Sequence, residues 1–440
     1  MDLSNLEKNK TIIKKIAMLG DEPLFWKTCA KIFFKVILNN YEWNSNGIKY
    51  KFILETISDQ DILNDKLSVS NYDVLIIPGG GVGDGHSITK GFNFSFKVRN
   101  WKKKIQRFVK DGGGIVGFCG GAALITPLST GKSRKPTTFV ERLYNKSSID
   151  ITSTYSYYKY LALPIYYPFQ KTHPERIGTM AYVFSFKPTE TEDGRNFHTG
   201  GIPIDIKINK NNPIFSDFPD DNLTIRWWGG QALLVPEKPD REIKICAKYP
   251  EKELHENEKT RIHAWRYVGG FKGFFKGFFK AMSYVKKEKI RIFDAAMFTY
   301  YLASKWKKTN KLILSDIANR PCIVTEVYPN ENKGRILLCT LHPEFMVWWD
   351  GVIEERKDEQ DICIANGLYQ WKNITTIKNP LDENITYTWW VVRRFVAWAT
   401  KIPEKEFPPI KIHKLNPEEM EQLSRNILWD GSLKNQMENI

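Results

Sequence analysis

The sequence predicts an α/β protein with a mostly parallel sheet that carries helices on both faces. Apolar strands alternate with helical segments over the first 130 residues, as in a doubly wound sheet. Two of these strands run into glycine clusters, "IIPGGG" (76–81) and "GFCGG" (117–121). The chain of 440 residues is 42% hydrophobic, with 14 Trp, 19 Tyr and 26 Phe, which is enough apolar material for a large core.

The elements of the N-terminal part follow from apolar runs and from helical spacing. Continuous apolar runs predict buried strands at 15–20, 50–57, 72–77 and 114–119. Helices are predicted over 25–40 and from Val98 to Val109, where apolar residues recur three and four positions apart until glycine ends the run. Ligands bind at the carboxyl ends of such strands, so we expect the two glycine clusters to be neighbours in space.

After about residue 130 the pattern loosens, and over 202–208 and 223–235 polar and apolar residues alternate as in antiparallel strands. The strands predicted there cover 202–208, 223–235, 241–250, 321–329 and 334–341. An amphipathic helix is predicted at 387–401. We therefore expect a core made of 1–250 and 321–401, a helical insertion at 251–320 and a polar C-terminal tail at 402–440. Within the insertion a helix is predicted over 294–308, "DAAMFTYYLASKWKK".

Cys119 ends an apolar run between Gly117 and Gly121, where the predicted strand turns into a helix. Glycine neighbours permit a sharp turn and let a substrate approach the backbone, as in the nucleophile elbow of hydrolases. The start of the following helix favours a thiolate, which is the nucleophilic form, and the N–H of Gly120 would bind an oxyanion. A second interpretation stays open, in which Cys119 is a buried structural cysteine.

A histidine and a glutamate follow the late apolar strand "GRILLCTL" in the segment "LHPEF". A cysteine nucleophile needs a base, and the base needs an acceptor that orients its ring. His342 would be the base, and Glu344, two residues further along extended chain, would project from the same side and orient it. The N–H groups of Gly79 or Gly80, together with that of Gly120, would form an oxyanion hole.

A second His-Pro-Glu sequence offers another candidate base. His173 precedes Pro174 and Glu175 but follows no continuous apolar strand, so we interpret it as part of a loop. His86 and Asp84 lie just beyond the first glycine cluster, where they would either line the pocket or be solvated loop residues. His342 is the better candidate because a buried strand delivers it to the sheet edge.

With these motifs the sequence resembles the class I glutamine amidotransferase-like proteins, and most closely the family related to the N-terminal domain of biotin–protein ligases. The residues that carry the resemblance are "PGG", "GFCGG" and "HPE" after strands, and "IRWWGGQALL" (225–234). The resemblance implies a flavodoxin-like sheet, a triad of Cys119, His342 and Glu344, and chemistry at a C–N bond of an amide-type small molecule. Ala123 stands where glutamine amidotransferases usually carry Gln, so the resemblance does not extend to glutamine as the substrate.

The segment "GGFKGFFKGFFKAMSY" (269–284) has a steep amphipathic pattern. Apolar residues recur at helical spacing from Phe271 to Met282, and a lysine at every fourth position follows another face. This pattern is typical of a helix that lies on a membrane surface. Two alternatives are open: the helix packs its Phe face on the sheet or on a second subunit, or it forms a lid over the active site.

Composition narrows the class of protein further. The six cysteines form no CxxC pair, which argues against a zinc site or a disulfide framework and suits a reducing compartment; we expect no metal and no cofactor. No signal peptide is evident, and no apolar run approaches the ~20 residues that span a bilayer. The net charge of +15 is spread along the chain without a nucleic-acid-binding motif, so nucleic acid is not an expected partner.

These observations favour a cytoplasmic, cysteine-dependent amidase or amidotransferase-like hydrolase. The alternative is a catalytically silent binding or scaffold module on the same fold, because a fold does not determine a function. A homo-oligomer and a peripheral membrane contact through 269–284 are further expectations about partners.

Overall fold

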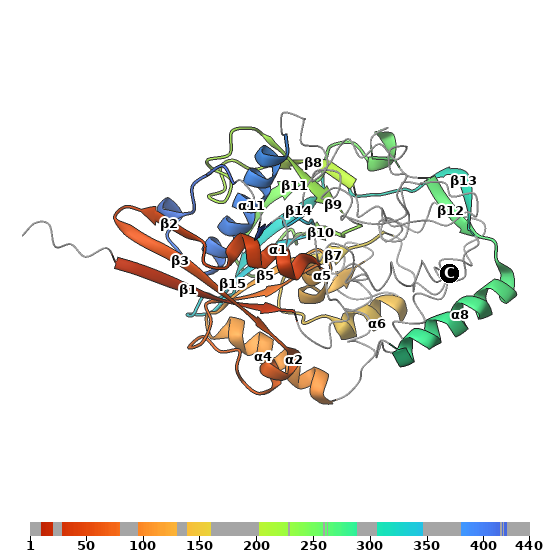
Figure 1. Ribbon diagram of the computed structural model, residues 1–440, viewed down its shortest axis with the longest axis horizontal. Helices are drawn as coiled ribbons and strands as arrows, with labels where there is room; N and C mark the ends of the chain where they lie inside the picture. Colours follow the sequence, from red (N-terminus) through yellow and green to blue (C-terminus); the bar gives the residue numbers. More distant parts are fainter. Residues whose placement is uncertain are drawn as a thin grey trace, which may run out of the picture.

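The computed structural model describes residues 10–20, 29–79, 96–129, 139–159, 202–227, 229–257, 260–261, 263–287, 306–345, 380–413, 416 and 418–419. The strands of its main sheet are β1 (Lys10–Leu19), β2 (Glu42–Ser45), β3 (Ile48–Ile57), β4 (Val74–Ile77), β5 (Gly114–Phe118), β8 (Ile202–Ile208), β9 (Asn222–Trp227), β11 (Ile243–Lys248), β14 (Pro321–Val327) and β15 (Arg335–Cys339). They are arranged in the order β2-β3-β1-β4-β5-β15-β14-β11-β8-β9 (Figure 1).

Half of this ten-stranded sheet is parallel. Strands β3, β1, β4, β5 and β15 run in one direction, and in chain order they are arranged 2-1-3-4-5, an order found in doubly wound sheets. Strand β2 at one edge and strands β14, β11, β8 and β9 at the other pair in antiparallel fashion. The α/β class and the parallel core are confirmed. The prediction of a mostly parallel, flavodoxin-like sheet is only partly correct, because five further strands pair in antiparallel fashion and double the number of strands.

Helices cover both faces of the parallel strands. They are α1 (Cys29–Leu38), α2 (Asp59–Leu63), α4 (Phe96–Lys110) and α11 (Pro380–Ala399). Successive side chains of a strand point to opposite faces, and in β1 the residues Ile16 and Met18 join the core cluster under α1 and α11. Ala17 and Leu19 join the cluster under α2 and α4. Figure 1 shows these two pairs of helices on opposite sides of the sheet.

From Thr388 to Ala399 helix α11 is buried on all sides, although its sequence predicts an amphipathic helix. Its two adjacent arginines lie in the interior. Arg393 Nε donates to the carbonyl of Ile37 at the end of α1, and Arg394 donates to the carbonyl of Pro408 and pairs with Asp217. The polar groups that suggested a solvated face therefore act as buried donors that hold other segments against the helix.

The hairpin of β2 and β3 extends the sheet beyond the strands that we predicted. Asn46 and Gly47 connect the two strands with positive φ angles of 48° and 76°. An Asn-Gly pair between two strands is a strong signal for a two-residue hairpin turn, because both central residues need positive φ. The signal was present in the sequence, and the four-residue strand before it was too short to stand out.

The chain after α11 packs on this hairpin, so the described part of the tail is integral to the core. Trp43 Nε1 donates to the carbonyl of Glu406 at 2.9 Å, and Tyr50 donates to the Glu406 carboxylate. Ile402 and Phe407 are buried in the cluster that contains Trp43. A short 3₁₀ helix, η6 (Glu404–Glu406), places these residues.

Three small groups of elements flank the main sheet. They are the sheet of β6 (Leu128–Ser129), β7 (Tyr155–Tyr157) and β10 (Ala232–Leu234); the helices α5 (Gly120–Ile125) and α6 (Phe139–Ser147); and the segment between β11 and β14. That segment contains η4 (Leu254–Glu256), the ribbon of β12 (His263–Tyr267) and β13 (Trp306–Leu312), and α8 (Gly270–Lys287). The helix predicted from 294 onward is wrong at 306–308, because pairing with β12 makes those residues a strand. Its earlier part lies outside the described residues.

We expect Phe407→Ala to lower the free energy of unfolding by ~3–5 kcal/mol, because it leaves a cavity in the core between the tail and the hairpin. Urea unfolding followed by tryptophan fluorescence measures the change. Ile412→Ala is the matched control on the same tail, since Ile412 is exposed. Equal, small effects of the two substitutions would contradict a tail that is part of the core.

Candidate active site

The candidate site lies where three neighbouring parallel strands end. Strand β5 pairs with β4 and with β15 in parallel register, with Gly117 opposite Ile77 and Phe118 opposite Cys339. The residues that follow the three strands therefore meet at one edge of the sheet. They include Gly79, Cys119 and His342, so the described part of the first glycine cluster lies beside the second as predicted.

Cys119 occupies a strained turn between β5 and α5. Its backbone has φ 45° and ψ −113°, and α5 begins at the next residue, Gly120. The Cys119 N–H donates to the carbonyl of Cys339 at 2.7 Å, and the Cys119 carbonyl accepts from the N–H of Ala123 at 3.1 Å. A non-glycine residue in such a conformation costs ~1–3 kcal/mol and occurs mainly at functional sites. The turn is thus of the nucleophile-elbow type.

The glycines on either side of Cys119 are required by close packing. A Cβ on Gly117 would lie 2.6 Å from Ile125 Cδ1 and 2.8 Å from the nitrogen of Ala122. A Cβ on Gly121 would lie 2.1 Å from the carbonyl oxygen of Ile77. No other residue type fits either position without moving backbone, so the spacing of the two glycines follows from how α5 folds back on β4 and β5.

His342 and Glu344 form a buried pair beyond the end of β15. His342 Nδ1 lies 2.7 Å from Glu344 Oε1, and the imidazole ring stacks on Phe345 with centroids 5.0 Å apart. The His342 N–H donates to the carbonyl of Arg226 at 2.9 Å, which fixes this segment to β9. Glu344 therefore holds the imidazole ring through Nδ1.

The side chains of Cys119 and His342 meet over Gly79. A Cβ on Gly79 would lie 2.6 Å from His342 Cε1 and 3.0 Å from Cys119 Cβ, so glycine is needed here. The three triad candidates are enclosed, with Cys119 6% and His342 1% exposed. Gly120 starts α5 beside them, whereas Gly80 lies outside the described residues.

His342 is more basic than an ordinary histidine. Burial alone lowers its pKa, but the charge of the Cys119 sulfur, the charge of Glu344 and the hydrogen bonds with both side chains outweigh burial and raise the pKa to about 10. The raised pKa is a property of the pair: negative charge on the sulfur favours the imidazolium, and an imidazolium in turn favours the thiolate.

Gln231 is a further residue of the site that the sequence did not identify. It is fully buried, and its Nε2 donates to the carbonyl of Cys119 at 3.2 Å while its Oε1 accepts from the Tyr158 hydroxyl. The Tyr249 hydroxyl donates to the Gln231 carbonyl at 2.9 Å and lies 2.8 Å from Thr340 Oγ1. The resemblance to the amidotransferase-like family included the segment "IRWWGGQALL", which contains Gln231. It assigned no role to any single residue of that segment.

His173, Pro174, Glu175, His86 and Asp84 lie outside the described residues. Among the residues that are described, no three His, Cys, Asp or Glu side chains gather as a metal site.

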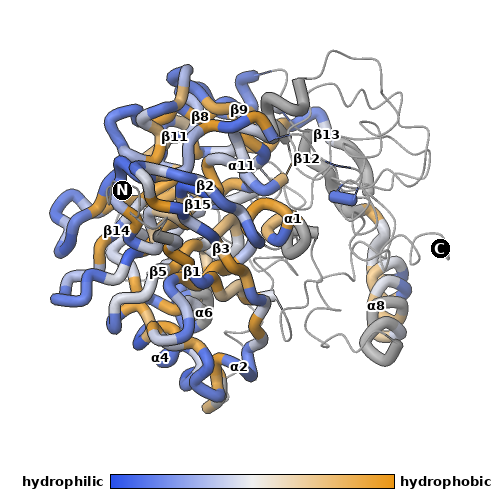
Figure 2. Tube along the Cα trace, turned by 60° about the vertical axis from the view of Figure 1, so that its left-hand side comes forward, coloured by the Kyte–Doolittle hydropathy of each residue, from blue (hydrophilic) through white to orange (hydrophobic). Residues whose placement is uncertain are grey.

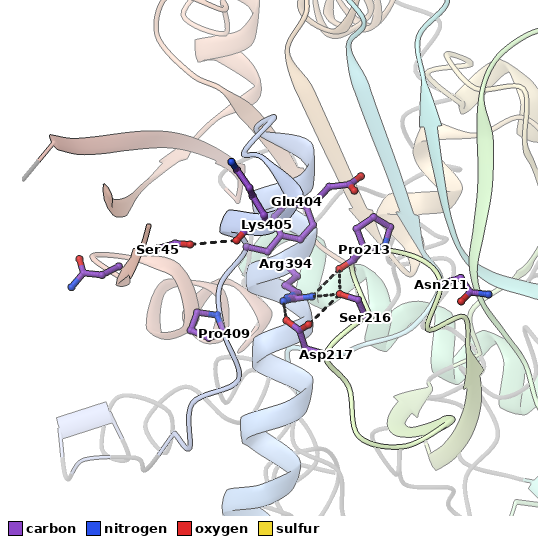
Figure 3. Close-up of a pocket in the computed structure, with 11 residues that line it drawn as sticks. Ser45, Asn211, Pro213, Ser216, Asp217, Arg394, Glu404, Lys405 and Pro409 are labelled. Carbon is purple, nitrogen blue, oxygen red and sulfur yellow. Dashed lines mark hydrogen bonds and ion pairs between the residues drawn. The ribbon is translucent and has the colours of Figure 1, made fainter. Parts of the chain in front are cut away.

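A polar pocket of about 550 Å³ lies elsewhere, beside α11 and η6. Figure 3 shows Arg394 in this pocket with its hydrogen bonds directed to Pro213 and Ser216 and its ion pair to Asp217. The guanidinium is occupied by protein groups, so the pocket belongs to the packing of the antiparallel strands against α11.

Comparison with known proteins leaves the family unassigned. No family model matches the chain, and no curated protein matches it. Among solved structures, the crystal structure of SMU.1228c is similar with a TM-score of 0.29 and 12% identity, over 88% of this chain and 100% of that one. At that TM-score the similarity carries no argument about function.

We expect His342 to keep its ring proton at pH 8 and to lose it only as the pH rises toward 10, whereas an ordinary histidine titrates near 6.5. NMR of the histidine Cε1–H groups measures the titration, with His342→Asn for assignment. Cys119→Ala should lower the pKa of His342, because the sulfur supplies the largest favourable charge. Cys246→Ala, at a buried cysteine of another strand, should leave it unchanged. A pKa of His342 near 6.5 would contradict an ion pair between His342 and the Cys119 thiolate.

We expect Gln231→Met to loosen Cys119, since it removes the amide that holds the carbonyl of the strained residue. Alkylation of Cys119 by iodoacetamide at neutral pH should slow about fivefold, the equivalent of one hydrogen bond of ~1 kcal/mol, and its pH profile should shift toward that of a free thiol. Gln106→Met is the matched control, because Gln106 Nε2 donates to the carbonyl of Ile149. If both variants lose stability and neither changes the pH profile, Gln231 is structural only.

Proposed function

We propose that the protein is a cysteine-dependent amidase or amidotransferase-like hydrolase that cleaves a C–N bond of an amide-type small molecule. One observation carries the proposal: Cys119 sits at a strained strand-to-helix turn beside His342, both side chains lie against Gly79, and Glu344 holds His342 Nδ1. Nucleophile, base and orienting acid in this chain are the parts that acyl transfer needs.

The first half of the reaction forms a thioester. The Cys119 thiolate attacks the amide carbonyl carbon, and the oxyanion of the tetrahedral intermediate accepts hydrogen bonds from the N–H of Gly79 or Gly80 and from that of Gly120. The imidazolium of His342 gives its proton to the leaving nitrogen. The C–N bond breaks, the amine departs, and the acyl group stays on sulfur.

The second half restores the enzyme. Neutral His342 takes a proton from water, and the resulting hydroxide attacks the thioester carbonyl. The C–S bond breaks, the acid leaves, and the thiolate and imidazolium are paired again. Glu344 takes no proton in this scheme: it keeps the ring oriented and stabilises the positive charge that His342 carries in the resting state.

The family that best fits this proposal is the class I glutamine amidotransferase-like superfamily, with the relatives of the biotin–protein ligase N-terminal domain as the closest variant. Two structural features support it: the 2-1-3-4-5 order of the parallel strands, and the elbow after the fourth of them. Ala123 lies in the first turn of α5 and is mostly buried. Its methyl group offers a substrate amide no hydrogen bond, so we propose a substrate other than glutamine.

A reducing compartment such as the cytoplasm suits this chemistry. The four cysteines that the structure describes in full, Cys119, Cys246, Cys322 and Cys339, form no disulfide and are buried. Burial raises the pKa of Cys246 to about 12, so this sulfur stays a thiol and is inert as a nucleophile. Cys119, by contrast, lies beside the imidazole of His342.

A catalytically silent binding module is the second candidate, and the enclosure of the site favours it. Cys119, His342 and Glu344 are all buried, whereas a catalytic sulfur has to meet its substrate. Reaction with a small electrophile separates the two functions.

We expect iodoacetamide to label Cys119 stoichiometrically at pH 7 in the folded protein. His342→Ala should slow the reaction about thirtyfold, since a thiol with an ordinary pKa near 8.5 is only about 3% ionised at this pH. Peptide mass spectrometry locates the label, and Cys246 serves as the internal control. Incubation of Cys119→Ala with cell extract then identifies a retained ligand. Labelling of Cys119 that is no faster than that of Cys246 would favour the binding module.

A further inference from the structure

Helix α8 is an amphipathic helix at the margin of the molecule. Both views place it away from the ten-stranded sheet (Figure 1, Figure 2). Its sequence, GFKGFFKGFFKAMSYVKK, has five phenylalanines and five lysines and lacks any acidic residue. It lies in the segment that connects β11 with β14.

The phenylalanines at every fourth position form a stripe that the protein does not bury. Phe271, Phe275 and Phe279 are 77%, 53% and 69% exposed. At 1.5 Å per residue the stripe is about 12 Å long. Gly277, on another side of the helix, is buried. The expectation that the Phe face packs on the sheet is therefore wrong for these three residues, and an exposed apolar patch of this kind marks an interaction surface.

The charges beside the stripe indicate what covers it. Lys272 and Lys276 are exposed and each follows a phenylalanine of the stripe, so ammonium groups flank the aromatic rings along one side. A second copy of the chain would bring two helices with five lysines each together, which like charges oppose. Anionic headgroups above an acyl layer would satisfy both the lysines and the rings.

The base of the connecting segment is fixed to the core, so the helix is presented from a rigid support. The Glu253 carboxylate accepts from the N–H groups of Ile317 and Ala318, and the Leu254 N–H donates to Ser315 Oγ at 3.1 Å. Leu254 is buried in the core cluster that also contains Ile317.

No helix among the described residues has the length and apolar content to cross a bilayer.

We propose that α8 is a docking helix that lies in the plane of an anionic lipid surface, with Phe271, Phe275 and Phe279 inserted at the headgroup–acyl boundary and Lys272 and Lys276 on the headgroups. The contact is peripheral and places the enzyme at the membrane without engaging the candidate active site.

Flotation of the full chain with vesicles tests the proposal. The wild type should bind vesicles of phosphatidylcholine mixed with phosphatidylglycerol and should not bind vesicles of phosphatidylcholine alone. The triple variant Phe271→Ser, Phe275→Ser, Phe279→Ser should lose at least tenfold in partitioning. The double variant Lys272→Glu, Lys276→Glu should abolish the preference for the anionic vesicles.

The matched control is Phe96→Ser with Phe139→Ser, because these two phenylalanines are 82% and 66% exposed on other helices. This variant should bind as the wild type does. Unchanged binding by the triple variant, or equal binding to both kinds of vesicle, would overturn the proposal. So would a wild-type dimer in light scattering that the triple variant converts to a monomer, because the face would then belong to a second copy.

Discussion

The hydrogen bond from the Cys119 N–H to the Cys339 carbonyl, at 2.7 Å, sets the geometry of the candidate site. It continues the ladder between β5 and β15, in which Phe118 lies opposite Cys339. Beyond this hydrogen bond, the chain that leaves β5 turns into α5, and the chain that leaves β15 continues to His342. Because the two strands are parallel, both continuations leave the sheet at the same edge, and residues far apart in sequence come into contact without a long loop.

The antiparallel half of the sheet supports the same edge from the other side. The carbonyl of Arg226 in β9 accepts from the His342 N–H, and a Cβ on Gly230 would lie 2.0 Å from the carbonyl oxygen of Thr340. Trp227 Nε1 donates to the carbonyl of Gly230 and closes this turn. Gln231 follows this turn, and its side-chain amide donates to the Cys119 carbonyl. The mixed character of the sheet is therefore tied to the site: parallel strands deliver the sulfur and imidazole, and antiparallel strands hold both.

The parallel core and the triad candidates could be predicted because their signals are local: an apolar run, the glycines that end it, and the polar residue that follows. Gln231 could not, since its partner lies more than a hundred positions away and its role depends on a turn packed on β15. The burial of Arg393 and Arg394 could not be predicted for the same reason. Two charged residues indicated a solvated face of the helix at 387–401, and only tertiary contacts supply the carbonyls that satisfy their buried guanidinium groups. The short strand β2 has no periodic run of its own, and the sequence signal for it was the Asn46–Gly47 turn that follows it.

The energetics of the site argue against a purely structural cysteine. Cys119 keeps a positive φ that a glycine would adopt without strain. His342 and Glu344 are ionisable groups in a position where apolar side chains of similar size would stabilise the fold at least as well. The imidazolium persists to about pH 10 because negative charge on both of its sides outweighs desolvation. Local strain and a desolvated, mutually dependent set of charges lie together at the carboxyl edge of the parallel strands, and this combination is what supports the proposal of a reactive centre.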